Sequence, residues 1–305
     1  MPRPTPRIGV IVPSINVVAE DDMVALARAL PQAPVGVHFA RAVVDTARPV
    51  AEQFRQMLDA APAHAAALAQ AGVAVTAFAC TSASFFQGPG ADLEIAARLS
   101  ARSGGLPALT TATAAVAALH ALGVRRVSIA TPYLDWVVQA ERAFFEQAGF
   151  EVLAINGLER RGGADIHDID DATLERLVAE VDRPGAEAVF VSCTDLPALG
   201  LVERLEARHG KPVVTSNQAT WWACAQVAGI GPRPGAGRLL REAPPWPPGV
   251  PGAPRPRTAP GGAVHPGIAP GTVAHPGFAP GGAVQAGIAP GDSVQPGSAR
   301  AGAAR

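Results

Sequence analysis

Two cysteines, Cys80 and Cys193, occupy matching places in the sequence. Each follows an apolar, strand-like run and stands directly before hydroxyl side chains, Thr81 and Ser82 in one case and Thr194 in the other. A thiol can act as a nucleophile or move a proton, and nearby hydroxyl groups can donate hydrogen bonds to a carboxylate. The placement predicts one site, shared by two similar halves, for a small acid whose adjacent carbon exchanges a proton or accepts a nucleophile.

Both cysteines are expected at the carboxyl ends of parallel strands, where ligand sites form in open α/β sheets. A thiol beside a helix start lies near free backbone N–H groups, which favour the thiolate. The alternative interpretation of a free cysteine is a small buried hydrophobe. We prefer that interpretation for Cys224, which follows Trp221, Trp222 and Ala223 in an apolar run.

Strand-like and helix-like patterns alternate along the chain in two similar series. The first series predicts strands at 8–12, 36–40, 73–79 and 106–109, with helices at 19–30, 49–70, 92–103 and 113–122. The second predicts strands at 126–130, 151–155, 188–192 and 213–215, with helices at 134–148, 171–181, 196–209 and 218–228. Such alternation is typical of parallel sheets covered by helices on both faces.

The sequence therefore predicts an α/β protein of two pseudo-symmetric lobes, with parallel sheets flanked by helices and a cleft between the lobes. We expect the first lobe at 1–110 and the second at 111–215. A final helix at 216–230 is expected to return to the first lobe.

The sequence changes character at about residue 231. Glycine, proline and alanine dominate 231–305, where a unit of about ten residues recurs with small changes. Proline lacks a backbone donor and glycine raises the entropic cost of order, so neither helix nor sheet is favoured. We interpret 231–305 as a disordered repeat tail, in which His265 and His275 would be poor metal ligands.

Composition narrows the class of protein. The 305 residues carry a formal net charge of -1 and no basic cluster, so there is no electrostatic case for a nucleic acid or an anionic membrane as partner. No apolar run reaches the roughly 18–20 residues of a membrane span. Three cysteines do not make a disulfide framework, and no secretory signal is evident. These features predict a cytoplasmic protein, and we interpret the stretch from His167 to Asp170 as an acidic loop.

Five stretches resemble the aspartate/glutamate racemase superfamily, in particular its branch of maleate cis-trans isomerases and arylmalonate decarboxylases. They occur in the family's order within residues 8–230: Val10-Ile-Val-Pro-Ser-Ile-Asn-Val-Val-Ala-Glu20, Ala79-Cys-Thr-Ser-Ala-Ser-Phe85, Thr131-Pro-Tyr133, Val191-Ser-Cys-Thr-Asp-Leu-Pro197 and Thr215-Ser-Asn-Gln-Ala-Thr220. The resemblance implies two pseudo-symmetric lobes with the site in their cleft, and no need for a metal or organic cofactor. Family members often associate, so a homo-oligomer is compatible with it.

The resemblance to maleate isomerases implies unequal roles for the two thiols. Cys80 would add to the double bond of maleate as the nucleophile and form a succinyl thioether, and Cys193 would supply a proton to the neighbouring carbon. Rotation about the new single bond, followed by elimination, would release fumarate. The resemblance and the hydroxyls beside the thiols together give the expected substrate-binding side chains: Ser14, Asn16, Thr81, Ser82, Tyr133 and Thr194.

The sequence also departs from the family. Maleate isomerases show Ser-Ser-Asn-Thr-Thr where this chain has Ser14-Ile-Asn-Val-Val18, so hydroxyls that would bind a dicarboxylate are replaced by apolar groups. Arylmalonate decarboxylases carry one catalytic cysteine, equivalent to Cys193, and a glycine in place of Cys80. Two thiols favour cis-trans isomerisation of maleate or a similar small dicarboxylate. The alternatives are a two-thiol racemase or an arylmalonate-type decarboxylase of another small carboxylic acid, and a non-catalytic carboxylate-binding homologue.

Overall fold

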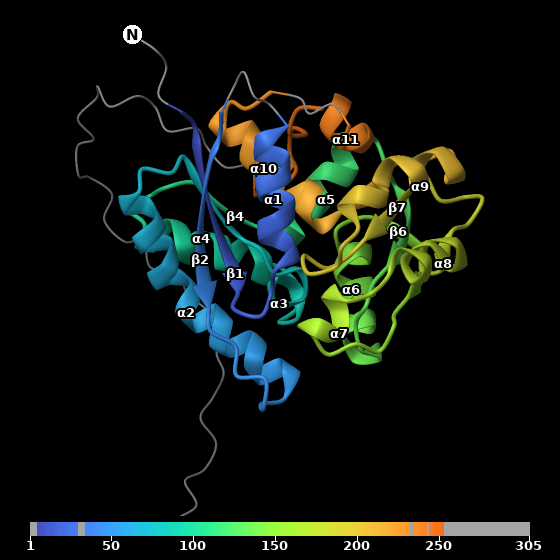
Figure 1. The fold of residues 1–305 in the computed structure, drawn as a ribbon, viewed down its shortest axis with the longest axis horizontal. Helices are drawn as coiled ribbons and strands as arrows, with labels where there is room; N and C mark the ends of the chain where they lie inside the picture. The colour runs from blue at the N-terminus through green and yellow to red at the C-terminus, as the bar shows by residue number, and fades with distance from the viewer. Residues whose placement is uncertain (1–4, 30–33, 232–234, 243, 253–305) are drawn as a thin grey trace, which may run out of the picture. The chain divides into compact units, whose positions relative to one another are not determined.

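The computed structural model describes residues 5–29, 34–231, 235–242 and 244–252. Within these ranges the chain forms two four-stranded sheets, each entirely parallel, with helices packed around them (Figure 1). The strand orders are β2-β1-β3-β4 in the first sheet and β6-β5-β7-β8 in the second. Because the second order repeats the first with every number raised by four, the two halves share one topology.

The first half contains the strands and helices from β1 to α5: β1 (Arg7–Pro13), α1 (Val18–Arg28), β2 (Gly36–Ala42), α2 (Val50–Gln70), β3 (Val75–Phe78), α3 (Thr81–Phe85), α4 (Ala91–Arg102), β4 (Ala108–Thr110) and α5 (Thr111–Ala121). The second half and the C-terminal elements follow: β5 (Arg126–Ala130), α6 (Asp135–Gln147), β6 (Glu151–Asn156), α7 (Ala164–His167), α8 (Asp171–Val181), β7 (Ala188–Val191), the 3-10 turn η1 (Leu199–Leu201), α9 (Val202–His209), β8 (Val213–Thr215), α10 (Ser216–Ala228) and α11 (Gly237–Glu242).

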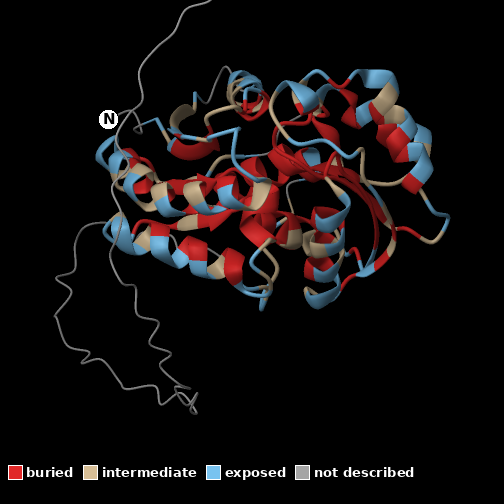
Figure 2. Ribbon diagram, turned by 90° about the horizontal axis from the view of Figure 1, so that it is seen from below, coloured by how far each residue is buried: buried red, intermediate tan, exposed pale blue. Residues whose placement is uncertain are grey.

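Continuous apolar runs form the central strands of both sheets. All four residues of β3 and all four of β7 are buried, as are the last six residues of β1. Strands of a parallel sheet are covered on both faces, so they lack the apolar–polar alternation of half-exposed strands. Figure 2 shows the same distribution, with buried residues concentrated on the strands and on the helix faces that meet them.

Each strand and helix expected from the sequence has a counterpart, with boundaries shifted by a few residues. The largest shift concerns the helix expected at 196–209, which begins as η1 and becomes α9 only at Val202. Pro197 lies in the turn that precedes it, and proline cannot donate a backbone hydrogen bond. The short helices α3, α7 and α11 were not expected, because four to six residues are too few to show a helical period.

The helix α10 packs against elements of both halves. It contacts β1 and β3 of the first sheet, β8 of the second, and α5 most extensively. One cluster of buried apolar side chains runs through both sheets, from Ile8 to Leu240. The lobe boundaries expected at residues 110 and 215 stay predictions, because this shared core crosses them.

The boundary expected for the tail, at residue 231, lies too early in the sequence. Part of the segment that follows residue 231 packs on the fold. The helix α11 follows α10, and the indole of Trp246 stacks on that of Trp222 with ring centroids 5.4 Å apart. The Trp222 indole N–H also donates to the Pro244 carbonyl at 2.8 Å. The remainder of the expected tail, 253–305, lies outside the described residues.

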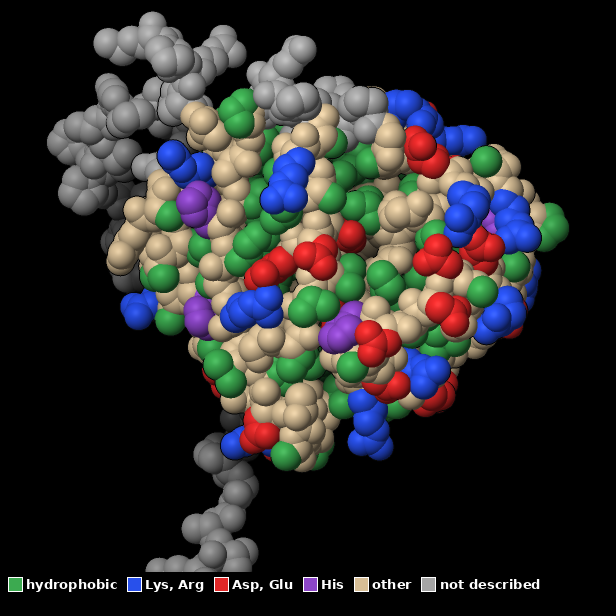
Figure 3. All heavy atoms as spheres, in the orientation of Figure 1, with side chains coloured by type: hydrophobic (Ala, Val, Ile, Leu, Met, Phe, Trp, Pro, Cys, Tyr) green, Lys and Arg blue, Asp and Glu red, His purple; other side chains and the backbone are tan. Residues whose placement is uncertain are grey.

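The described surface carries mixed charges. On the face shown in Figure 3, acidic and basic side chains lie interspersed, without a large patch of one sign among the coloured residues. No helix within the described ranges is long and apolar enough to cross a membrane.

The packing of Trp246 generates a stability prediction. A chain ending after residue 231 loses the Trp222 stack and the acceptor at Pro244, so its unfolding free energy should fall relative to a chain ending after residue 252. Trp246→Ala should account for about 1–3 kcal/mol of that fall. Urea unfolding followed by circular dichroism measures the unfolding free energies of the two truncated chains and of Trp246→Ala. Equal midpoints for the two truncated chains would contradict the described packing.

Candidate active site

A cavity opens where the loops that follow β1, β3, β5 and β7 meet. The loop after β1 supplies Asn16, and the segment after β3 supplies Cys80 and Ser82. The loop after β5 supplies Tyr133, and the loop after β7 supplies Cys193 and Thr194. All four loops leave the carboxyl ends of parallel strands, which is where ligand sites form in such sheets. Six of the eight side chains expected at a site from the sequence therefore line one cavity.

The remaining walls of the cavity are mostly apolar. They come from the end of β1 and the loop after it, from the β2–α2 connection and α2, from the start of α6, from the segment 160–166 and from the loop after β7: Pro13, Ile15, Val44, Val50, Gln53, Phe54, Met57, Leu134, Val137, Arg160, Arg161, Gly162, Gly163, Ile166 and Asp195. The cavity volume is about 70 Å³. An apolar cavity that holds benzene measures about 150 Å³, so this one suits a small ligand.

Cys80 lies directly before α3 with an extended backbone. Its Sγ is 3.9 Å from the Ser82 hydroxyl oxygen. Burial raises the pKa of the Cys80 thiol to about 11, and hydrogen bonds from the Ala83 N–H and the Ser82 hydroxyl only partly offset that rise. The expected support of a thiolate by N–H groups at a helix start is therefore present but smaller than the effect of burial.

Cys193 follows β7 in an unusual backbone conformation. Its φ angle is +104°, in the region that residues other than glycine seldom adopt. Its N–H donates to the Ser216 hydroxyl at 3.0 Å, and the Asp195 N–H lies 3.4 Å from its Sγ. Burial and the charge of Asp195 raise the pKa of the Cys193 thiol more strongly than that of Cys80. Both thiols are therefore protonated at neutral pH.

Hydrogen bonds through Thr194 join the loops of the two sheets. The Thr194 hydroxyl donates to the Ala79 carbonyl at 3.0 Å and accepts from the Asn16 side-chain amide at 2.9 Å. The Asn16 side-chain oxygen in turn accepts from the Ala19 N–H near the start of α1. Arg41 holds the same loop, donating to the Ser14 and Asn16 carbonyls at 3.0 Å each.

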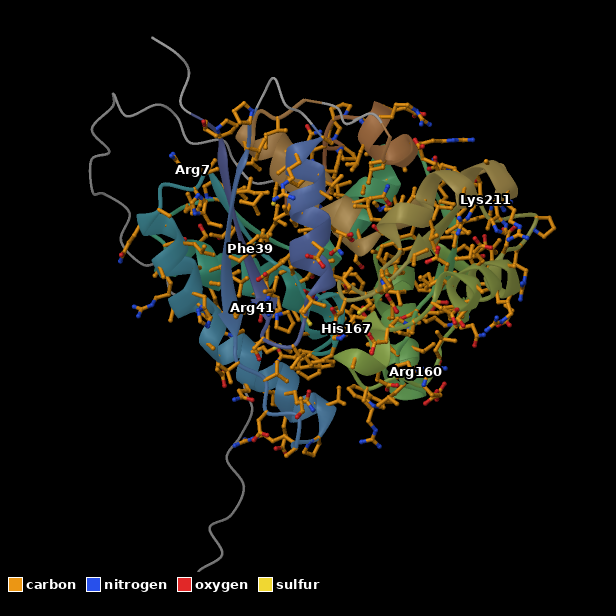
Figure 4. All side chains as sticks on the ribbon, in the orientation of Figure 1. Arg7, Phe39, Arg41, Arg160, His167 and Lys211 are labelled. Carbon is orange, nitrogen blue, oxygen red and sulfur yellow. The ribbon has the colours of Figure 1, made fainter. Side chains whose placement is uncertain are left out.

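Asp195 was not expected at the site, although it lies two residues after Cys193. One of its carboxylate oxygens accepts from the Val17 and Val18 N–H groups at the start of α1. The other lies 3.4 Å from the His167 ring nitrogen Nδ1. In Figure 4, His167 is labelled on α7 and Arg160 on the segment that precedes α7. His167 is the last residue of α7 and belongs to the stretch that the sequence predicts as an acidic loop. Sequence spacing does not predict its contact with Asp195.

A carboxyl group is buried on α6. Glu141 is fully buried, and burial raises its carboxyl pKa to about 8, partly opposed by the nearby hydroxyl groups of Ser192 and Thr131. The Tyr133 hydroxyl is also buried and has no well-formed hydrogen bond within the described residues. Burial, the two thiols and Glu141 raise the Tyr133 pKa well above its usual value. The Tyr133 hydroxyl therefore stays protonated and remains a donor.

Two of the expected substrate-binding residues lie outside the cavity lining. The Ser14 hydroxyl accepts from the Val44 N–H at 3.0 Å, and the Thr81 hydroxyl pairs with that of Ser216 at 2.9 Å. Cys224 is fully buried within α10, in agreement with its interpretation as a core residue. Within the described residues, no group of three or more His, Cys, Asp or Glu side chains could hold a metal ion. Catalytic and binding roles for the eight residues stay predictions.

Comparisons of the sequence with known proteins agree on one family. The family described as arylmalonate decarboxylase matches residues 8–240. The arylmalonate decarboxylase of Bordetella bronchiseptica is 34% identical over 248 residues, which cover 78% of this chain and 98% of the relative. A maleate isomerase of Pseudomonas putida is 31% identical over 244 residues, with coverage of 78% and 98%.

Solved structures give the same grouping. A maleate isomerase from Pseudomonas putida, solved with maleate, has a TM-score of 0.73 at 27% identity and covers 77% of this chain and 97% of that one. A Nocardia farcinica maleate cis-trans isomerase, solved as a cysteine-to-serine mutant with a covalently bound succinylcysteine intermediate, has a TM-score of 0.73 at 29% identity, with coverage of 78% and 98%. A double mutant of arylmalonate decarboxylase follows with a TM-score of 0.68 at 31% identity and coverage of 78% and 100%.

The buried carboxyl of Glu141 generates a pH prediction. Its pKa rises from 4.5 to about 8 on folding, so the folded protein holds a proton that the unfolded chain has released between these values. The contribution of Glu141 to the unfolding free energy should therefore be highest below about pH 4.5 and fall as pH rises to about 8. Glu141→Gln should remove about 2–4 kcal/mol of this fall.

Asp22→Asn provides the control for this prediction. The carboxyl of Asp22 has a pKa raised by burial to about 7, so its part of the fall ends one pH unit earlier. Urea unfolding of both variants from pH 4 to pH 9 separates the two contributions. A wild-type slope that persists unchanged in Glu141→Gln would show that Glu141 does not hold the proton.

Proposed function

The chain belongs to the arylmalonate decarboxylase family, and on this premise we propose that it is an isomerase that needs no cofactor. The proposed reaction is the cis-trans isomerisation of maleate, or of a similar small dicarboxylate, through a cysteine thioether. The relatives include both maleate isomerases and an arylmalonate decarboxylase, all with between 27% and 34% identity over nearly their whole length.

The presence of two thiols on one cavity carries the proposal. Cys80 and Cys193 enter the cavity from the ends of β3 and β7, in different sheets. A decarboxylation that uses one cysteine does not require the second. Addition to a double bond with proton delivery to the neighbouring carbon requires both a nucleophile and an acid. The Nocardia farcinica isomerase was solved with a succinylcysteine intermediate, which is the product of such an addition.

The two thiols differ in the way that the reaction requires. The pKa of Cys80 is raised less than that of Cys193, so Cys80 releases its proton more readily and supplies the nucleophile. Cys193 keeps its proton and supplies the acid. The charge of Asp195 contributes to this difference, because it raises the pKa of Cys193 more than that of Cys80.

The steps balance without any added reagent. The Cys80 thiol, the more acidic of the two, first releases its proton to water at the cavity. The resulting thiolate forms a C–S bond to one alkene carbon, and the other carbon takes the proton of the Cys193 thiol. The bond between the two carbons is now single and rotates. The Cys193 thiolate then removes a proton from its carbon, the C–S bond breaks, and Cys80 leaves as a thiolate. Cys193 is again a thiol, and Cys80 can react again as the thiolate or regain a proton from water.

The size and the polar groups of the cavity support a small acid. A volume of about 70 Å³ is about half of that which holds a benzene ring, so an aryl substituent would require the walls to move. Ser82, Tyr133 and the side-chain amide of Asn16 supply donors beside the thiols. A buried donor that has no well-formed hydrogen bond within the described residues, such as the Tyr133 hydroxyl, gains most from a ligand carboxylate.

The apolar walls favour a second candidate, a two-thiol racemase of a 2-substituted carboxylic acid. Val44, Phe54, Met57 and Val137 face the cavity, and Ile15 stands where maleate isomerases have a serine. In a racemase one thiolate removes the α-proton and the opposite thiol returns a proton to the other face. A small apolar substituent would lie against these four side chains, whereas the second carboxylate of maleate would need a donor elsewhere in the lining, such as Gln53, Arg160 or Arg161.

Single cysteine variants test the two-thiol mechanism. Cys80→Ala and Cys193→Ala should each lower conversion of maleate to fumarate by on the order of 10³-fold or more, because each removes a reacting group. Cys224→Ala is the matched control, since Cys224 is fully buried in α10 and does not line the cavity. Proton NMR measures fumarate directly. A fully active Cys80→Ala or Cys193→Ala variant would rule out the mechanism.

Incubation in D2O separates the two candidates. An isomerase should form fumarate from maleate and leave the α-proton of lactate or 2-methylbutyrate in place. A racemase should exchange the α-proton of a 2-substituted acid for deuterium and leave maleate unchanged. Proton NMR follows both signals in one sample, and Cys80→Ala should abolish whichever is found. Loss of carbon dioxide from an arylmalonate that persists in Cys80→Ala would instead indicate a decarboxylase.

A further inference from the structure

The first residue of α10 lies between the two cysteine loops. Thr215 caps this helix: its hydroxyl accepts from the Gln218 N–H, and the Gln218 side chain accepts from the Thr215 N–H. Ser216 therefore has no part in the capping interaction. Its side chain is fully buried, so its hydroxyl has only protein groups as partners.

The Ser216 hydroxyl contacts both loops. It accepts from the Cys193 N–H at 3.0 Å and lies 2.9 Å from the Thr81 hydroxyl, one residue after Cys80. A serine hydroxyl has one proton to donate and two lone pairs to accept, so it can make both bonds at once. One oxygen atom thus links the backbone of Cys193 to the residue that follows Cys80.

The Cys193 backbone depends on such support. A positive φ in a residue with a Cβ is unfavourable and persists only where surrounding contacts fix it. The hydrogen bond to Ser216 holds the N–H of this residue. The bond from Thr194 to the Ala79 carbonyl holds the neighbouring residues of the same two loops. The cysteines are therefore tied on both sides, through Ala79 and Thr194 and through Thr81 and Ser216.

We propose that Ser216 is a positioning residue that fixes the placement of the Cys193 thiol relative to Cys80. The proposal rests on the proposed function only in that both thiols react. Ser216 does not line the cavity and acts through the backbone of Cys193 and the side chain of Thr81. Reacting groups that are displaced by about 1 Å lose roughly 10²-fold in rate, which sets the scale of the expected effect.

The variant Ser216→Ala tests the proposal against Thr220→Val. Thr220 lies one turn further along α10, is equally buried, and makes two hydrogen bonds, to the Thr111 hydroxyl at 2.8 Å and the Ser216 carbonyl at 2.9 Å. It contacts neither cysteine loop through its side chain in the described hydrogen bonds. The two variants therefore remove comparable buried hydroxyls, and only one of them should disturb Cys193.

Alkylation of the thiols gives a readout that needs no substrate. Each protein is treated with iodoacetamide at pH 8.5, and labelling of Cys80, Cys193 and Cys224 is followed by peptide mass spectrometry. Ser216→Ala should label Cys193 about threefold or more faster than wild type, because its loop loses a tether and opens locally. Thr220→Val should label it at the wild-type rate. Equal rates in the two variants, or acceleration of Cys224 together with Cys193, would overturn the proposal.

Turnover of maleate provides the second measurement. Ser216→Ala should lower kcat by roughly 10–100-fold with KM changed by less than about twofold, since Ser216 positions a reacting group and does not bind substrate. Thr220→Val should keep both values within about twofold. A wild-type protein that leaves maleate unchanged would count against the proposed function, whereas the alkylation rates would still decide the role of Ser216.

Thr81→Val breaks the same hydrogen bond from the side of the loop after β3. This variant replaces Ser216→Ala as the test if Ser216→Ala does not fold. It removes the hydroxyl partner of Ser216 and should also accelerate labelling of Cys193, to a smaller extent. The double variant should label no faster than Ser216→Ala alone, because both changes break one bridge. An unchanged rate in Thr81→Val, or multiplied rates in the double variant, would contradict the bridge.

Discussion

The hydrogen bond from the Thr194 hydroxyl to the Ala79 carbonyl joins the two strand ends on which the candidate site depends. Each sheet could present its own cysteine at a strand end without the other. Only when the loops after β3 and β7 are fastened together do the two thiols share a cavity. Asn16 donates to the same threonine, so the loop after β1 is positioned by the same contact.

Burial of this junction sets its electrostatics. The surrounding protein excludes most of the water from both thiols and raises their pKa values above the usual range. Asp195 makes the pKa values of the two thiols unequal, because its carboxylate raises the pKa of Cys193 most strongly. The N–H groups at the start of α1 hold this carboxylate in place. A neutral pair with unequal acidity is suited to a reaction that needs a nucleophile and a proton donor in turn.

Local patterns were enough to predict the strands, the longer helices and the position of both cysteines at strand ends. Parallel strands are long apolar runs, and their carboxyl ends follow from chain direction alone. The contacts of Glu141, His167 and Ser216 could not be predicted, because each joins elements distant in sequence. The packed segment around Trp246 could not be predicted, because its proline-rich composition is typical of a disordered chain. Composition does not reveal that the Trp246 ring stacks on Trp222.

The stacking of Trp246 on Trp222 has a consequence for the order of synthesis. Ribosomes release a chain from its N-terminus, so α10 emerges before the segment that covers it. Until residue 246 has left the exit tunnel, the apolar face of Trp222 and its indole N–H lack their final partners. Exposed apolar surface of this kind invites association between nascent chains. The helix α10 therefore completes its packing only after the chain up to residue 246 has left the ribosome.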